Sequence, residues 1–106
     1  MKLSKAILKG CKKSQPGYCE LITVIGKTTH ACAIGAAMLG VGAEYMCDLE
    51  DHIGIELNDW PPVDTLPTLN DEKKPFVTLF DQLTFTNDLF VMTREEIAYG
   101  LAKAGL

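Results

Sequence analysis

The sequence has no apolar run that approaches the ~20 residues of a membrane-spanning helix. It also has no internal repeat and no low-complexity tract. Its opening residues, MKLSKAILKGCKKSQPG, are too polar and interrupted for a secretion signal. These absences predict a cytoplasmic protein with one helical domain over residues 1–106 and no membrane partner.

The sequence also has no excess of basic residues, since its net charge is −4 and its pI is about 5.0. Binding to nucleic acid depends on neutralising phosphates, so the composition argues against a nucleic-acid partner. An acidic block between residues 48 and 59 resembles a calcium loop. Counted from Asp48, however, the sixth position should be glycine and is Ile53, so calcium is not expected there.

Metal-binding cysteine pairs are absent as well, because none of the four cysteines forms a Cys-x-x-Cys pair. Without a secretion signal, the cysteines are expected to be free thiols. The residue types that suit zinc make only weak candidate ligands, since their spacing fits no usual site. They are Cys19, His30, Cys32, Cys47 and His52. We therefore predict no metal and no cofactor.

The stretch that the chain is expected to surround is Thr29–Gly40, predicted as a short helix capped by Thr28 or Thr29. Its side chains are mostly small and apolar on every side, which is typical of a buried helix. Gly35 in its interior should cost about 1 kcal/mol relative to alanine, which predicts that a neighbouring element packs tightly against it.

Three further helices are predicted around this centre. The first spans Leu3–Lys13 with Ser4 as its cap, and the second spans Pro75–Leu83. The third begins with a capping box at Thr93–Glu96, and its apolar face is expected to pack against the central helix.

Tyr18–Ile25 could be a short strand or an extended lead-in, and residues 43–75 give no clear pattern beyond one short helix. The predicted fold is a mainly α-helical bundle of four to five short helices around the buried central helix, with room for one short extended segment.

Two sequence motifs carry a resemblance. They are Cys32-Ala33-Ile34-Gly35-Ala36-Ala37 in the centre, and Asn87-Asp88 followed by Thr93-Arg94-Glu95-Glu96-Ile97. Together with the opening MKLSKAI, the chain resembles a domain-of-unknown-function group of short bacterial and phage proteins. Here Met92 stands where such proteins often have tryptophan, and a Cys-Pro-x-Cys pair found in some members is missing. The resemblance implies a small, mostly helical domain and no particular activity.

Cys32 is the sharpest candidate for chemistry, because the first turn of a helix would stabilise a thiolate. His30 or His52 could serve as its base, and Asn87 or Asp88 could orient that base. The competing interpretation makes Cys32 a small buried hydrophobic residue. Likewise, Asn87-Asp88 is either a turn or a polar site that faces the start of the central helix.

The closing segment also resembles the first helix of a helix-turn-helix. Its side chains expected to be exposed are too acidic for a groove-reading helix, and they include Arg94, Glu95, Glu96 and Lys103. The favoured function is a small accessory or protein-interaction domain of a kind that phages also encode, with a protein partner and no catalysis. The alternative is a cysteine-dependent enzyme using Cys32.

Overall fold

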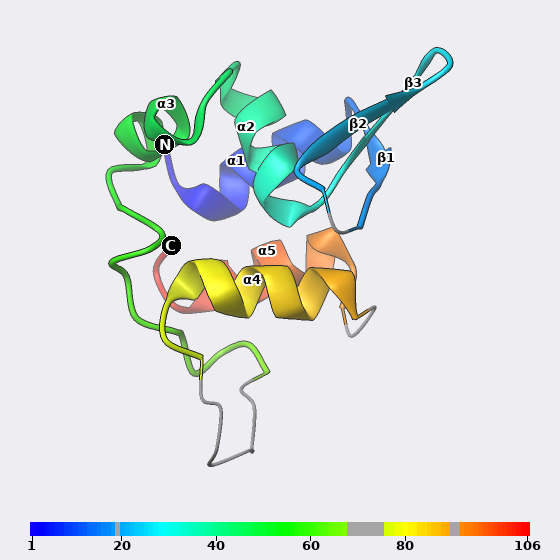
Figure 1. Cartoon of the computed structure of the whole chain (residues 1–106). Helices are drawn as coiled ribbons and strands as arrows, with labels where there is room; N and C mark the ends of the chain where they lie inside the picture. Colours follow the sequence, from blue (N-terminus) through cyan, green and yellow to red (C-terminus); the bar gives the residue numbers. More distant parts are fainter. Residues whose placement is uncertain (19, 68–75, 90–91) are drawn as a thin grey trace.

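The computed structural model describes residues 1–18, 20–67, 76–89 and 92–106. These residues form five helices and one three-stranded sheet (Figure 1). In chain order the elements are α1 (Leu3–Cys11), β1 (Gln15–Pro16), β2 (Ile22–Ile25), β3 (Thr28–Ala31), α2 (Ala33–Val41), α3 (Met46–Ile53), α4 (Leu79–Asp88) and α5 (Arg94–Lys103). The fold is therefore α+β, and the prediction of a mainly α-helical bundle is wrong.

The region predicted as one central helix, Thr29–Gly40, is divided between a strand and a helix. Its first residues belong to β3, Cys32 is the N-cap, and α2 begins only at Ala33. β3 is the middle strand of the sheet, antiparallel to β2 and parallel to β1. The backbone hydrogen bonds that hold it extended therefore come from residues elsewhere in the chain, which local helix signals do not reveal.

α2 itself is buried, as its composition predicts, and residues 33–38 are all inaccessible. Its tight packing at Gly35 is confirmed, because a Cβ atom there would lie 1.7 Å from the carbonyl oxygen of Leu21. This contact brings the chain just before β2 directly onto the backbone of α2. The sheet and the helix are therefore fixed against each other by backbone contact.

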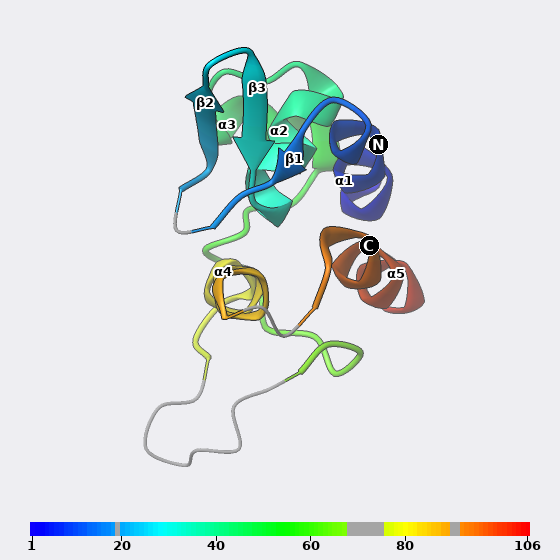
Figure 2. The same ribbon diagram turned by 90° about the vertical axis from the view of Figure 1, so that its right-hand side faces the viewer.

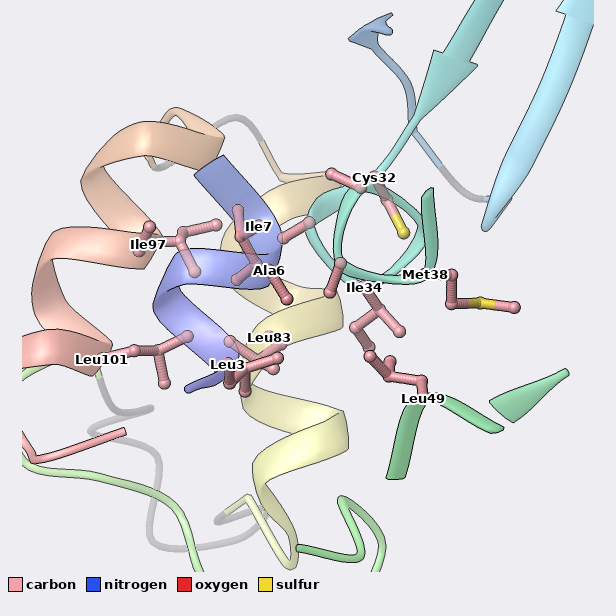
Figure 3. Close-up of a cluster of buried hydrophobic side chains, with 14 of the residues drawn as sticks. Leu3, Ala6, Ile7, Cys32, Ile34, Met38, Leu49, Leu83, Ile97 and Leu101 are labelled. Atoms are coloured by element: carbon pink, nitrogen blue, oxygen red, sulfur yellow. The ribbon is translucent and has the colours of Figure 1, made fainter. Parts of the chain in front are cut away.

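α1 and α2 cross with their backbones touching. A Cβ on Gly10 would lie 1.6 Å from the carbonyl oxygen of Ala36, and one on Gly40 would lie 2.0 Å from that of Ala6. Leu3 and Ile7 of α1 enter the core beside this crossing (Figure 3). Ser4, the expected cap of this helix, is instead a buried residue inside it, and Lys2 is the N-cap.

α4 begins later and ends later than the sequence predicts. Thr78 caps it by accepting a hydrogen bond from the Asp81 N–H, and the predicted start at Pro75 lies outside the described residues. Asn87 and Asp88 are its last two residues and not a separate turn. The side chain of Asn87 consequently projects from the C-terminal end of a helix, where it reaches the neighbouring elements.

α5 has the predicted capping box, in which Thr93 and Glu96 exchange side-chain and backbone hydrogen bonds. Ile97 and Leu101 are fully buried, but they face α1 rather than α2, as Figure 3 shows. The expectation that this face packs on the central helix is therefore wrong. Among the helices that the structure describes, none is long and apolar enough to cross a membrane.

The strand order is β1-β3-β2, so β2 is an outer strand (Figure 2). Gly26 and Lys27 join it to β3 in a tight hairpin, and Gly26 has a φ of 64°, a conformation that glycine adopts without strain. The tip of this hairpin projects away from the helices (Figure 1).

Candidate functional site

Asn87 joins three elements at the start of α2. Its Oδ1 accepts a hydrogen bond from the Ala33 N–H at 3.0 Å, and its Nδ2 donates to the Gly17 carbonyl at 2.9 Å and to Asp88 Oδ1 at 3.0 Å. The residue is almost completely buried. It therefore satisfies one of the free N–H groups at the start of α2 and ties α4 to the segment after β1.

Cys32 lies beside this junction as the N-cap of α2. Its Sγ accepts a hydrogen bond from the Gly35 N–H at 3.4 Å, and the side chain is buried. Burial raises the pKa of the thiol, and the charge of Asp88 raises it further, while the N–H groups of Gly35 and Ile34 act in the opposite direction. Cys32 therefore stays a protonated thiol at neutral pH and is not activated as a nucleophile.

Among the described residues, neither histidine is hydrogen-bonded to Cys32. His30 Nδ1 lies 3.3 Å from the Pro16 carbonyl, and His52 Nδ1 lies 2.8 Å from the Asp48 carbonyl within α3. The structure therefore brings Cys32, Asn87 and Asp88 together but directs both imidazoles to backbone carbonyls. A nucleophile, a base and an orienting group are not assembled by these residues.

The residues considered as metal ligands do not gather. Within residues 1–18, 20–67, 76–89 and 92–106, no three histidine, cysteine or acidic side chains are placed to hold a metal ion. Cys19 lies outside the described residues, and Cys11, Cys32 and Cys47 are free cysteines. Cys47 and His52 are both exposed residues of α3, whereas His30 belongs to β3.

A pocket of about 170 Å³ opens between the chain before β2, the start of α2 and α4. Its walls are largely apolar, with the Cys32 thiol among them and the carboxylates of Glu20 and Asp88 as its two charged groups. The lining residues are Glu20, Leu21, Cys32, Ile34, Phe80, Leu83, Thr84 and Asp88. The arrangement suits one apolar group with a positive charge beside it.

Arg94 is a structural residue of this region that the sequence did not reveal, since it was expected to be exposed. It is only 5% exposed, and its guanidinium donates to Ser14 Oγ, the Ser14 carbonyl and the Ala31 carbonyl at 2.8, 3.0 and 3.3 Å. Its Nε is buried without a partner. Arg94 thus holds α5 to the segment between α1 and β1 and to the end of β3. Its position at the first residue of a capped helix gave no local sign of this role.

Comparison with protein-family models, with curated proteins and with solved structures found no match. The resemblance to the domain-of-unknown-function group therefore stays a prediction. The site itself offers an apolar pocket, a thiol whose pKa is raised by burial, and two carboxylates.

Proposed function

We propose that the protein is a non-catalytic interaction domain whose pocket at Cys32 receives one apolar side chain of a protein partner. The observation that carries this proposal is the size and lining of the pocket. An apolar cavity of about 150 Å³ accepts a benzene molecule, so the 170 Å³ found here suits a single ring or a branched aliphatic group.

Binding interfaces are commonly dominated by a few such anchors seated in desolvated pockets. Here the anchor would contact Leu21, Ile34 and Leu83, which come from the chain before β2, from α2 and from α4. Because three elements supply these walls, the pocket depends on the complete fold. The Asn87 hydrogen bonds that hold α4 against α2 keep its two main walls in place.

The charges of Glu20 and Asp88 indicate what should flank the anchor. Carboxylates beside an apolar pocket favour a cation next to the bound group through electrostatic complementarity. The proposed ligand is therefore a segment with an aromatic or branched aliphatic residue next to lysine or arginine. The protonated Cys32 contributes an uncharged, polarisable wall rather than a reacting group.

A titration with three matched compounds tests this proposal. Benzylammonium, benzyl alcohol and phenylacetate carry the same ring and differ in charge. We expect binding to weaken in that order, with a Kd of about 1 mM for benzylammonium, or about −4 kcal/mol. Amide chemical shifts of Leu83 and Thr84 in the full chain would report the binding, because both residues line the pocket.

Two tryptophan variants give the matched control. Thr84→Trp fills the pocket and should abolish the shifts, whereas Val77→Trp adds the same ring at a residue that is 78% exposed and outside the pocket. Asp88→Asn should reduce the preference for benzylammonium over benzyl alcohol. Equal binding to both tryptophan variants, or no binding of any of the three compounds in the millimolar range, would overturn the proposal.

A further inference from the structure

We propose that a second copy of this chain pairs with the free edge of β2, in antiparallel orientation, to form a symmetric dimer. This inference rests on the geometry of the hairpin rather than on the pocket at Cys32, although Glu20 and Leu21 belong to both surfaces. β2 pairs with β3 on one side only, and its other side is the outer edge of the sheet (Figure 2). An outer strand offers unpaired backbone groups to another strand.

The register shows which backbone groups are free. The Cys32 N–H donates to the Leu21 carbonyl, and the pairing then runs from Ile22 opposite Ala31 to Ile25 opposite Thr28. In an antiparallel pair, residues that exchange hydrogen bonds alternate with residues whose N–H and C=O point away. The backbone N–H and C=O groups of Leu21, Thr23 and Ile25 therefore point toward β3, whereas those of Ile22 and Val24 point away from it.

Nothing else in the described part of the chain occupies this edge, since no hydrogen bond there reaches the N–H or C=O of Ile22 or Val24. Because Ile22 and Val24 are two positions apart, their outward backbone groups can face those of the same two residues in an antiparallel second copy. Placing Ile22 opposite Val24 of that copy makes two pairs related by a twofold axis, each able to exchange both backbone hydrogen bonds.

The same register gives the exposed apolar side chains suitable partners. Val24 and Ile25 are 65% and 64% exposed, so two consecutive branched aliphatic side chains of the edge strand lie in solvent. In the paired arrangement Val24 meets Ile22 of the second copy on one face of the sheet, and Ile25 meets Leu21 of that copy on the other face. A one-residue slip would separate these pairs, so the register is well specified.

Charge supports a second copy as the occupant of this edge. Glu20 precedes the strand and Lys27 follows it, and both are exposed. In this register Glu20 of each copy lies opposite Gly26 of the other, one residue from Lys27, so opposite charges come near each other at both ends of the shared edge. A parallel arrangement would instead place like charges side by side.

Sedimentation equilibrium over a range of concentrations tests the dimer. The apparent mass should rise from the monomer's 11.6 kDa toward twice that value. Val24→Pro removes an N–H that points away from β3 and should lower the association constant at least tenfold. Val24→Thr keeps that N–H in a β-branched residue and serves as its control.

Two charge-reversal variants test the dimer even if Val24→Pro disturbs the hairpin. Glu20→Lys and Lys27→Glu should each weaken self-association, because each brings like charges together twice. An equimolar mixture of the two variants should restore it, since every contact then joins opposite charges. A wild-type chain that stays monomeric up to millimolar concentration, or a mixture that associates no better than either variant alone, would overturn the proposal.

Discussion

Replacing Gly10 by alanine would place a methyl group where the backbone of α2 already lies. The added Cβ would be 1.6 Å from the carbonyl oxygen of Ala36, and it would also meet the carbonyl carbon and Cα of that residue, at 2.3 and 2.7 Å. Ordinary contact would require α1 and α2 to move apart by about 2 Å. Because the obstacle is backbone, no change of side-chain rotamer can relieve it.

The expected loss follows from two opposing terms. Alanine favours a helix interior by about 1 kcal/mol over glycine. Overpacking of a core costs about 1–3 kcal/mol, and more where the backbone must move. Since the separation would also loosen Leu3 and Ile7 from the core, we expect Gly10→Ala to destabilise the protein by about 3 kcal/mol. That is a large part of the roughly 5–15 kcal/mol that stabilises a typical domain.

Chemical denaturation followed by circular dichroism would measure this loss, with Gly100→Ala as the matched control. Gly100 is also a buried helical glycine, but the atom nearest to an added Cβ is Leu66 Cδ2, at 2.5 Å, and the nearest backbone atom, the Thr65 carbonyl oxygen, is 3.0 Å away instead of 1.6 Å. That methyl group is the end of a flexible side chain, so the control should lose no more than about 1 kcal/mol. Equal losses for the two variants would refute the proposed contact between α1 and α2.

Three further predictions concern other parts of the structure. Thr93→Ala should cost about 1 kcal/mol by removing a cap, and Ile97→Ala about 2–5 kcal/mol by opening a cavity, so denaturation should rank them in that order. Asn87→Ala leaves the Ala33 N–H and the Gly17 carbonyl without this partner and should cost about 2 kcal/mol in the same assay, whereas an unchanged midpoint would contradict the bridging role. Burial raises the pKa of the Cys11 thiol to about 11, so as the pH rises the unfolded chain loses this proton before the folded chain does. The contribution of this thiol to folding stability is therefore complete below about pH 8.5 and is lost as the pH rises through 11. As the pH rises over that interval, the free energy of unfolding of the wild type should fall relative to that of Cys11→Ser.

Features that depend on neighbouring residues could be predicted from the sequence. Thr93 and Glu96 are three positions apart, and their capping box forms as expected. The small apolar residues of α2 correctly indicated burial, and Gly35 correctly indicated a tight contact. In each case the physical cause is contained in a few consecutive residues, so the pattern alone was sufficient.

Features that depend on distant partners could not be predicted in this way. Thr28–Ala31 is a strand because β1 and β2 lie on either side of it, and its own residues do not specify that pairing. Arg94 is buried because acceptors from residues 14 and 31 are present around it. Of the candidate site, the proximity of Cys32, Asn87 and Asp88 was anticipated as one alternative. The direction of both histidines toward backbone carbonyls was not.

The hydrogen bonds of Asn87 and Arg94 have a consequence for the order in which the protein folds. They join residues separated by 70 and 80 positions, so the junction of sheet, α2 and α5 cannot close until most of this chain has been synthesised. Contacts of such long sequence separation slow folding, because a large loop must be ordered before any of them forms. We therefore expect slower refolding than short helices alone would give, with the first hairpin and the crossing of α1 and α2 forming before α5 docks.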